Sequence, residues 1–236
     1  MISENVKPES GPQLTLLGGR KGSVSRSDGL SQPLNLFGEV VRSISFDQDE
    51  IIANILSLHS KDGKIDIDPT YSTGNFYRGR IPQPKLKFDI EPQIKGVLYA
   101  KAQELPVKSD SAFTIMFDPP FVVGSHNEGF ISGIIKDRFG YYKNMDELWK
   151  FYKDSLIEFY RILTKGGIVI FKCQDTVSGG KNYFSSMEIY KMANEVGYYA
   201  KDLFIYLSKS RIVPKRDILN QQHARKFHTY FWVFEK

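Results

Sequence analysis

MDELWKFYKDSLIEFYRILTKGGIVIF, residues 145–171, joins a helical pattern to a strand pattern. Apolar side chains recur at helical spacing, which predicts an amphipathic helix over 145–163; they are Met145, Leu148, Trp149, Tyr152, Leu156, Phe159, Tyr160 and Leu163. The Lys-Gly-Gly stretch at 165–167 ends that helix. Residues 168–171 are then all apolar, without alternation, as a strand buried on both faces requires. A helix that leads into a doubly buried strand favours an α/β fold.

Similar patterns flank this unit on both sides. Short apolar strands are predicted at 64–68, 86–90 and 112–117, and a helix capped by Asp49 is predicted through residues 51–58. Downstream, a helix at about 184–196 ends at Gly197, and strands at about 201–208 and 227–234 can form an antiparallel pair at one edge. Strands that alternate with helices predict a mostly parallel sheet covered on both faces.

The chain has 236 residues, of which 41% are hydrophobic, and this suits one domain with a sizeable core. Residues 1–40 are rich in Gly, Ser, Pro and Gln without an apolar period, so we expect a flexible polar tail there and one domain over 41–236. The connection at 121–145 is long and punctuated by glycines, which suggests a lid or substrate loop.

Several classes of protein are disfavoured by the composition. A single cysteine, Cys173, excludes an internal disulfide framework or a multi-cysteine zinc site, and the four histidines show no metal-ligand spacing, so no metal is expected. No apolar stretch approaches the ~18 residues of a membrane span, and the first residues do not resemble a secretory signal. We therefore expect a cytoplasmic protein of bacterial, archaeal or phage type.

The net charge of +5 is concentrated near the C-terminus. Between residues 201 and 228 there are seven basic and two acidic side chains, so this segment carries the whole excess. A local basic patch of this kind is a candidate surface for phosphate groups, although a solvated charged face has the same composition.

Three of the predicted strands end in a carboxylate, namely Asp68, Asp89 and Asp118. Ligands of a parallel sheet bind outside the carboxyl ends of its strands. The three side chains are therefore expected to meet at one site.

The stretch DPTYSTGNF at 68–76 resembles the first motif, D-P-x-x-G-x-G-N-F, of S-adenosylmethionine-dependent methyltransferases that methylate amino groups in DNA. The resemblance implies that Asp68, Pro69, Thr70, Thr73 and Gly74 lie around S-adenosylmethionine. Ser72 stands where that family has its first glycine. A serine is comfortable there only at negative φ, so we expect a turn with that geometry.

Two further contacts with the cofactor follow from the same resemblance. An acid at the end of the second strand holds the ribose hydroxyls in this family, which assigns Asp89 together with the adjacent Ile90. A carboxylate suits that task because it accepts two hydrogen bonds at once. Lys101 replaces the family's adenine-binding acid in the stretch KAQELP at 101–106, so backbone groups or Gln103 are expected to bind the adenine.

Asp118, Pro119, Pro120 and Phe121 match the [DNS]-P-P-[YFW] motif of methyltransferases that act on a planar nitrogen. Asp118 and the Pro119 carbonyl can accept the N–H groups of an amine and orient its lone pair, while the two prolines fix the backbone in advance. Phe121 can stack on a flat base removed from the helix. These four residues are the predicted catalytic group.

Substrate contacts are expected from loops on the same rim and from the basic segment. The candidates are His126, Arg138 and Tyr141 in the long connection, Lys181 after the strand at 168–171, and Arg211, Lys215, Arg216 and Arg225 near the C-terminus.

The resemblance implies a single Rossmann-like class I methyltransferase domain, with a mostly parallel seven-stranded sheet, helices on both faces and an antiparallel C-terminal edge. The predicted reaction is methylation of an exocyclic amino group of a nucleobase, with adenine N6 in DNA favoured over RNA. Three alternatives stay open: an RNA enzyme acting on adenine N6 or guanine N2, a cytosine N4 DNA enzyme, and a non-catalytic nucleic-acid-binding relative. No large target-recognition domain is visible, so a loose sequence preference or a partner protein is expected.

Overall fold

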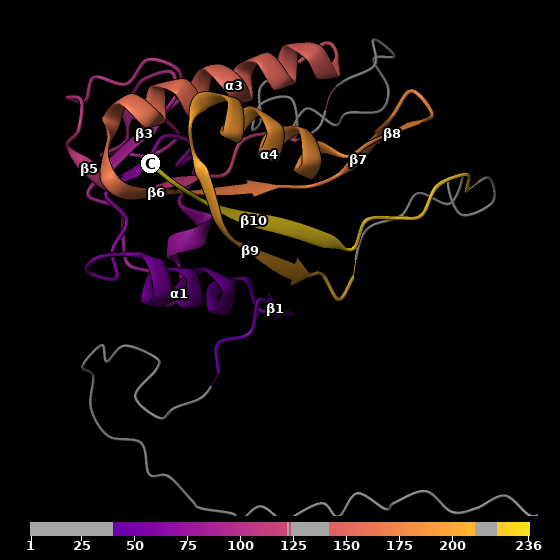
Figure 1. The fold of residues 1–236 in the computed structure, drawn as a ribbon, viewed down its shortest axis with the longest axis horizontal. Coiled ribbons are helices and arrows are strands. Elements are labelled where there is room, and N and C mark those ends of the chain that lie inside the picture. Colours follow the sequence, from indigo (N-terminus) through magenta and orange to yellow (C-terminus); the bar gives the residue numbers. More distant parts are fainter. Residues whose placement is uncertain (1–39, 122, 124–141, 211–220) are drawn as a thin grey trace, which may run out of the picture. The chain divides into compact units, whose positions relative to one another are not determined.

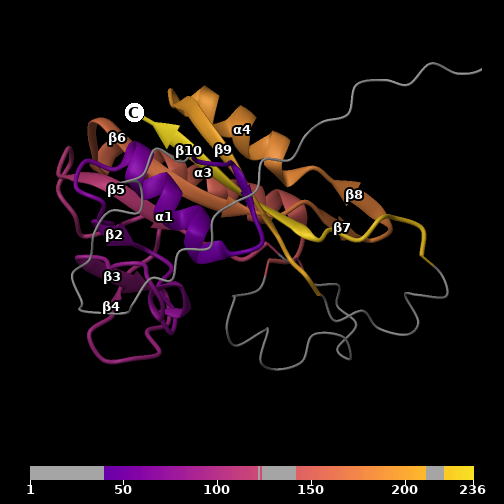
Figure 2. The same cartoon turned by 90° about the horizontal axis from the view of Figure 1, so that it is seen from below.

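The computed structural model describes residues 40–121, 123, 142–210 and 221–236. Eight strands form one sheet in the order β1-β9-β10-β6-β5-β2-β3-β4. Their bounds are β1 Ile44–Ser45, β2 Ile67–Asp68, β3 Leu86–Asp89, β4 Leu98–Tyr99, β5 Ala112–Phe117, β6 Leu163–Cys173, β9 Tyr199–Leu207 and β10 His228–Glu235. Figure 2 shows this sheet with β4 at one end.

The sheet is mostly parallel. Strands β4, β3, β2, β5 and β6 pair in parallel, and β10 pairs antiparallel to both β6 and β9, so it is the one reversed strand in this sheet of the described residues. The predicted α/β class with an antiparallel pair near the C-terminus is confirmed. The two-residue strand β1, which pairs in parallel with β9, extends the predicted seven strands to eight.

The direction of strand addition reverses at β2. From β2 the chain adds β3 and then β4 on one side, and later adds β5 and β6 on the other. Such a reversal leaves a crevice at the carboxyl ends of the two central strands, where helices and loops diverge to opposite faces. The carboxyl ends of β2 and β5 therefore mark the expected ligand site.

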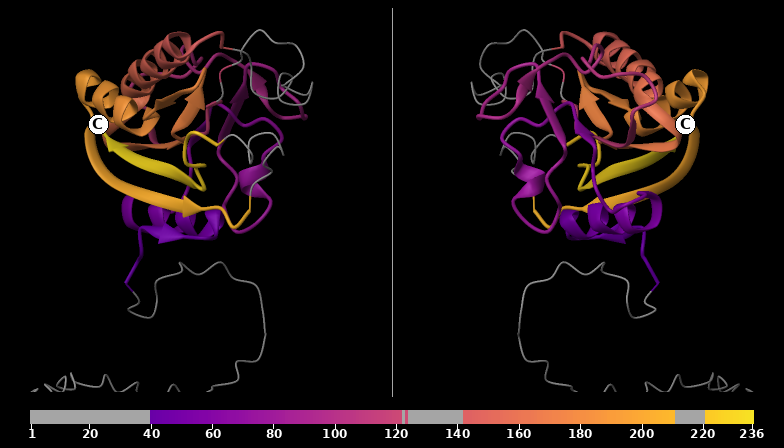
Figure 3. Two further views of the ribbon diagram at one scale, coloured as in Figure 1. Left: turned by 90° about the vertical axis from the view of Figure 1, so that its right-hand side faces the viewer. Right: turned by 90° about the vertical axis from the view of Figure 1, so that its left-hand side faces the viewer.

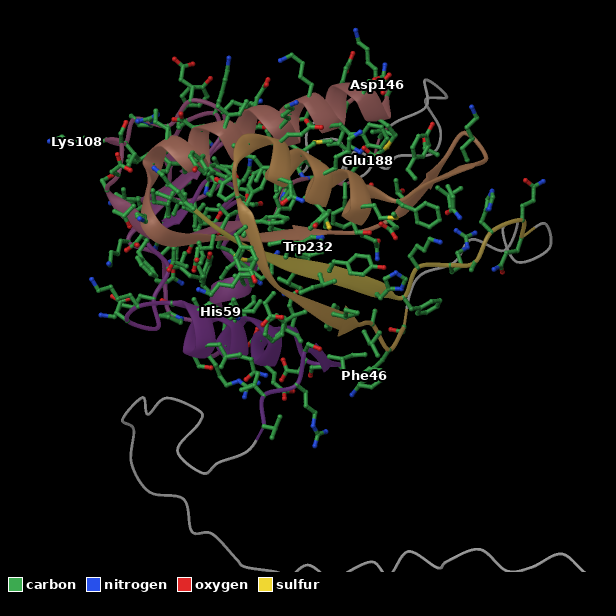
Figure 4. All side chains as sticks on the ribbon, viewed as in Figure 1. Phe46, His59, Lys108, Asp146, Glu188 and Trp232 are labelled. Atoms are coloured by element: carbon green, nitrogen blue, oxygen red, sulfur yellow. The ribbon has the colours of Figure 1, made fainter. Side chains whose placement is uncertain are left out.

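Helices cover both faces of the sheet, as Figures 1 and 3 show. Helix α1, Gln48–His59, packs on one face, and helices α3, Met145–Ile162, and α4, Ser185–Val196, pack on the other. Figure 4 shows the same separation, with His59 of α1 on the opposite side of the sheet from Glu188 of α4.

Strand alternation divides the core into two clusters. Val169, Phe171 and Cys173 of β6 face α3 and α4, whereas Ile168 and Ile170 face α1, and all five are fully buried. A continuous apolar run is therefore what this strand requires. Burial raises the pKa of the Cys173 thiol well above its usual range, so the thiol stays protonated.

The helix ends have clear physical causes. Asn144 caps α3 by accepting a hydrogen bond from the Glu147 N–H, and Gly197 ends α4 with φ 115°. Helix α1 is capped by Asp47, whose carboxylate accepts N–H bonds from Asp49 and Glu50. The prediction of Asp49 as the cap was wrong, because the backbone is already helical at Gln48.

Several strand bounds differ from the predictions. The strand predicted at 64–68 is reduced to β2, although Asp66 still bonds to both neighbouring strands through its backbone and also accepts the Phe113 and Thr114 N–H groups with its side chain. Strand β6 begins at Leu163, before the two glycines, and Gly166 has φ 77° within it. Strands β1 and β4 have no apolar pattern of their own in the sequence, since two residues carry too short a pattern to detect.

A small hairpin follows β6. Strands β7, Thr176–Ser178, and β8, Lys181–Tyr183, pair antiparallel across Gly179 and Gly180, which both have positive φ. Two consecutive left-handed residues form the tight turn whose twist matches a hairpin. A short 3₁₀ helix, η1, Asn75–Tyr77, lies after β2.

The helices of the described residues include none that combines the length and the apolar character needed to cross a bilayer. The predicted tail at 1–40 lies outside the described residues apart from Val40, and most of the predicted lid at 121–145 also lies outside them.

Candidate active site at the carboxyl ends of the strands

The ends of β2 and β5 are joined by the side chain of Thr70. The Thr70 N–H and hydroxyl both donate to Oδ1 of Asp68, at 2.8 and 3.3 Å. The same hydroxyl accepts the backbone N–H of Asp118 at 3.0 Å. The strand reversal therefore brings two of the three predicted carboxylates to one place and fixes the turn between them.

Asp68 is almost completely buried, with 1% of its surface exposed. Its Oδ2 accepts the Tyr77 hydroxyl at 2.6 Å, so both oxygens have donors from within the chain. Burial raises the pKa of Asp68 to about 7, opposed by the bonds from Tyr77 and Thr70 and reinforced by the nearby charge of Asp118. Asp68 thus titrates near neutral pH at the centre of the site.

Asp118 faces Lys172, which lies next to it on β6. Lys172 Nζ donates to Oδ2 at 3.3 Å and lies 3.2 Å from Oδ1 without hydrogen-bond geometry. The Oδ1 atom is buried, and no donor for it exists among the described residues. Burial raises the pKa of Asp118, and the positive charge of Lys172 opposes that rise. Among the described residues, this oxygen therefore has an ion-pair partner in Lys172 but no hydrogen-bond donor.

The backbone of the Pro-Pro motif is held from helix α3. The buried Tyr152 hydroxyl donates to the Pro120 carbonyl at 2.6 Å. Pro119 is buried and Phe121 is half-buried. Within the described residues no hydrogen bond to the Pro119 carbonyl is found, which leaves it available as an acceptor. Asp118 Oδ1 and the Pro119 carbonyl, the two acceptors predicted for the amine, thus have no hydrogen-bond donor within the described residues.

Asp89 ends β3 and holds the neighbouring turns. Its Oδ2 accepts the Ser72 N–H and its Oδ1 accepts the Glu91 N–H, each at 2.8 Å. A carboxylate has about four acceptor positions, so two remain for a ligand. Glu91, the next acid along the chain, lies just beyond the strand end and is exposed.

The prediction of negative φ at Ser72 was wrong. Its φ is 50°, in the left-handed region that costs a non-glycine residue about 1–2 kcal/mol. The hydrogen bond to Asp89 offsets part of this cost, because the left-handed backbone turns the Ser72 N–H toward the carboxylate. The turn after β2 therefore contains a left-handed serine whose N–H is bonded to the end of β3.

Gly74 is constrained by close packing as well as by φ. Its φ is 70°, and a Cβ there would lie 2.5 Å from the Tyr71 hydroxyl. Tyr71 is itself fixed, because its hydroxyl donates to Gln83 Oε1 at 2.6 Å and its ring stacks on Tyr77. The turn after β2 therefore needs glycine at this position.

The remaining predicted cofactor residues lie on the same rim or beside it. Pro69 is buried, Thr70 and Thr73 are half-buried, and Ile90 is 60% exposed although it is apolar. Gln103 lies in a turn after β4, half-buried, while Lys101 is exposed and forms an isolated bridge with Glu104. Their contacts with a cofactor stay predictions.

Two of the predicted substrate residues lie in the described part of the chain, and both are exposed. Lys181 begins β8, and Arg225 lies in the segment before β10. His223 joins these regions, because its Nε2 lies 2.8 Å from the Gly180 carbonyl at the hairpin turn. The others lie outside the described residues: His126, Arg138, Tyr141, Arg211, Lys215 and Arg216.

Three residues of the site were not singled out from the sequence: Tyr77, Tyr152 and Lys172. Lys172 had a detectable signal, since it follows an apolar run that is buried on both faces and is itself only 14% exposed. A lysine at such a position requires an anion nearby. Tyr77 and Tyr152 lie in aromatic-rich patterns that a core alone explains.

No protein-family model and no curated protein sequence matches this chain. Solved structures with a similar fold include TTHA0409 from Thermus thermophilus, a candidate DNA modification methylase (TM-score 0.41, 15% identity, 58% of this chain and 52% of that one). TTHA0409 has also been solved with S-adenosyl-L-methionine. The cytosine-N4-specific PvuII DNA methyltransferase is another (TM-score 0.45, 16% identity, 58% and 48%).

The [4+2]-cyclase SpnF is similar over a larger share of both chains (TM-score 0.46, 13% identity, 80% and 81%). This chain spans about half the length of TTHA0409 and of the PvuII enzyme. A DNA methyltransferase and a cyclase thus resemble this chain to the same low degree, and the likeness does not establish what this chain does.

Proposed function

We propose that this protein is an S-adenosylmethionine-dependent methyltransferase that acts on an exocyclic amino group of a nucleobase, with adenine N6 in DNA as the target. The observation that carries the proposal is Asp118 Oδ1, a buried carboxylate oxygen without a donor among the described residues. An unpaired buried acceptor is costly, so its retention at the carboxyl ends of the strands favours a ligand N–H as its partner.

The residues present are compatible with S-adenosylmethionine. Asp89 keeps acceptor positions for the two ribose hydroxyls, and the exposed Ile90 beside it offers an apolar surface for the adenine. Gly74 allows a ligand close to the turn, where any side chain would collide with Tyr71. Asp68 supports the cofactor site through Thr70 and Tyr77, which hold this turn.

When bound, the cofactor would supply a methyl group on a positively charged sulfur. The amine nitrogen would bond to the methyl carbon as the bond between this carbon and the sulfur breaks. The nitrogen is a poor nucleophile because its lone pair is delocalised into the ring. Asp118 Oδ1 and the Pro119 carbonyl accept the two N–H bonds and orient the lone pair. The nitrogen must lose one proton, and the ionised carboxylate of Asp118 is the adjacent group that can accept it.

Phe121 and the rigid backbone complete the proposed arrangement. Phe121 is half-buried, so one part of its ring is available to stack on a flat base. The Tyr152 hydroxyl holds the Pro120 carbonyl, which keeps the acceptor of Pro119 in place before the substrate binds. Such preorganised positioning is the main source of rate enhancement that these residues can provide.

A nucleic-acid substrate suits the surface beyond β6. The hairpin and the segment before β10 carry Lys181, Arg225 and Lys226, and the Lys226 ammonium lies 6.0 Å from the ring centre of the exposed Phe184. Basic side chains beside exposed rings are the usual means of binding single-stranded or extruded nucleotides. We propose that Lys181 and Arg225 bind phosphates of the substrate, together with the predicted residues outside the described part.

The test combines cofactor binding with transfer of labelled methyl groups to DNA and to RNA separately. We expect the wild type to bind S-adenosylmethionine in calorimetry and to label DNA. Asp118→Asn should bind the cofactor equally well and transfer about 100-fold more slowly, since it removes a charged acceptor. The control is Asp146→Asn, an exposed acid in the first turn of α3 (Figure 4), which should retain full activity.

Other outcomes identify the alternatives. Label in RNA alone would identify an RNA enzyme, and N4-methylcytosine in DNA would identify the cytosine target. A protein that binds nucleic acid but no S-adenosylmethionine would be a non-catalytic relative, consistent with Ser72 and Lys101 at positions where the resembling family has glycine and an acid.

A further inference from the structure

Strand β6 carries two lysines, and Lys172, next to its last residue, is the less exposed of them. Its side chain is 14% exposed, and its Nζ lies 4.7 Å from the ring centre of Phe76 in η1. Strand alternation directs Lys172 to the same face as Ile168 and Ile170, which belong to the core beneath α1. Burying an ammonium there is costly unless a specific anion compensates it.

Asp118 is that anion. Among the described residues, its carboxylate is the only hydrogen-bonding or ion-pairing partner of Lys172. The ring of Phe76 contributes a weaker attraction through its negative face. Phe76 belongs to η1 after β2 and Asp118 directly follows β5, so the ammonium of Lys172 links β6 to two neighbouring segments of the site.

We propose that Lys172 is the positioning residue of Asp118, holding its carboxylate ionised and oriented so that Oδ1 faces the substrate amine. The inference rests on the proposed function and assigns a role that the sequence motif does not include. Lys172 makes its hydrogen bond to Oδ2 and leaves Oδ1 without a donor. The ammonium thus lies at nearly the same distance from both carboxylate oxygens, 3.3 Å from Oδ2 and 3.2 Å from Oδ1, and has hydrogen-bond geometry only toward Oδ2.

Ionisation of Asp118 requires such a cation because no other neighbour in the described residues supplies a positive charge. Asp68 faces it from β2 and repels a second negative charge, and the hydroxyls of Tyr77 from η1 and Tyr152 from α3 remain neutral at physiological pH, since burial raises the pKa of both. Burial also raises the pKa of Asp118, and Lys172 is the group that lowers it. Without Lys172, Asp118 would take up a proton at higher pH and would lose an acceptor position.

The sign of the pH effect follows directly. Asp118 accepts the substrate N–H only when ionised, so activity falls as the pH decreases through the pKa of Asp118. Replacing Lys172 with a neutral side chain raises that pKa and moves the acidic limb of the activity profile to higher pH. A residue with a purely structural role would lower activity or stability without moving this limb.

The experiment measures the carboxyl ¹³C titration of Asp118 by NMR, assigned with Asp118→Asn, in the wild type and in Lys172→Met. We expect the pKa of Asp118 to rise by about one unit or more in Lys172→Met. Methyl transfer at pH 7 should fall about 10- to 100-fold, with the acidic limb moved upward by the same amount as the pKa and with unchanged affinity for S-adenosylmethionine. Lys172→Arg keeps the charge and should restore most of the activity and the profile.

Controls separate this role from general damage. Lys153→Met removes an exposed lysine of α3 that pairs with Glu195, and it should change neither the titration nor the profile. Lys172→Gln is a second neutral variant if Lys172→Met does not fold. An unchanged pKa of Asp118 in the neutral variants, with an active wild type, overturns the role of Lys172 alone. A wild type that methylates no substrate overturns the proposed function, and with it the role of Lys172 in the reaction.

Discussion

Two carboxylates that are two residues apart on one strand have opposite environments. At the amino end of β2, Asp66 accepts N–H bonds from Phe113 and Thr114 at 2.7 and 3.0 Å and pairs with Lys85. At the carboxyl end, Asp68 is buried beside Asp118 without a cation of its own among the described residues. Asp66, which joins strands, thus has a cation and two N–H donors, whereas Asp68, at the expected ligand site, has hydrogen bonds but no cation among the described residues.

The pKa values of the two groups follow that division. Although burial acts to raise it, the bonds from Lys85 and from the two backbone N–H groups lower the pKa of Asp66. For Asp68, burial prevails and the pKa rises to about 7. Perturbed groups of the second kind concentrate at functional sites, because a site must retain charges that stability alone would remove.

The largest effect is expected for Asp68→Asn and depends on pH. A raised pKa means that the folded wild type keeps a proton that the unfolded chain releases, so its stability falls as the pH rises from about 4 to about 7. The asparagine does not titrate. Relative to wild type, Asp68→Asn should therefore gain on the order of 3 kcal/mol between pH 4 and pH 8, measured by urea unfolding.

The neighbour at the other end of the strand provides the control for that measurement. Asp66→Asn should show no such gain at high pH, because the pKa of Asp66 is lowered rather than raised. If the difference in the free energy of unfolding between wild type and Asp68→Asn does not change with pH, then folding does not raise the pKa of Asp68.

The second effect is the loss of stability in Asp66→Asn at neutral pH. The substitution removes the charge from three hydrogen bonds that join β2 to β5 and to Lys85, and should cost about 2 kcal/mol in the free energy of unfolding. Since the pKa of Asp66 is lowered, this contribution is present above pH 4 and is lost as the pH falls through the folded pKa.

A second acid near Lys85 separates the effect of the ion pair from the effect of the buried hydrogen bonds of Asp66. Asp62 lies 3.8 Å from the same lysine, Lys85, but its side chain is 48% exposed. Asp62→Asn should cost much less than Asp66→Asn, as exposed ion pairs usually do. Equal losses in the two variants would show that the hydrogen bonds of Asp66 to β5 contribute little.

The smallest effect is expected for Ser72→Gly, in the turn at the carboxyl end. Glycine accepts the φ of 50° without strain and keeps the N–H that bonds to Asp89, so we expect a gain of about 0.5–1 kcal/mol in thermal or urea unfolding. Gly74→Ala is the opposite control, since a Cβ there meets Tyr71, and it should destabilise. A loss of stability in Ser72→Gly would mean that the serine side chain itself is required.

The sequence predicted the elements that have long patterns. The stripe at 145–163 and the apolar run at 168–171 correspond to α3 and the buried part of β6, because a repeated pattern averages over local exceptions. Strands β1 and β4 have two residues each and form through their neighbours in the sheet, so no local pattern reveals them. The turn at Ser72 was misjudged because its φ depends on Asp89, which is 17 residues away.

The residues of the candidate site also fall into two groups, those that the sequence predicted and those that it did not. Asp68, Asp89 and Asp118 were predicted from their positions at strand ends, and the structure brings the first and third together through Thr70. Lys172 and Tyr152 were missed because each contacts the Pro-Pro motif from another element, across the sheet or from α3. Contacts of that kind need the topology, and a single sequence supplies it only through its general class.

The most direct test of the central claim is the composition of nucleosides in cells that express the protein. The host should lack its own adenine methylation, and DNA and RNA should be digested separately and analysed by mass spectrometry for the wild type and Asp118→Ala. We predict N6-methyldeoxyadenosine in the DNA of the first and its absence from the second. Identical nucleosides from both strains, in DNA and in RNA, would contradict the account.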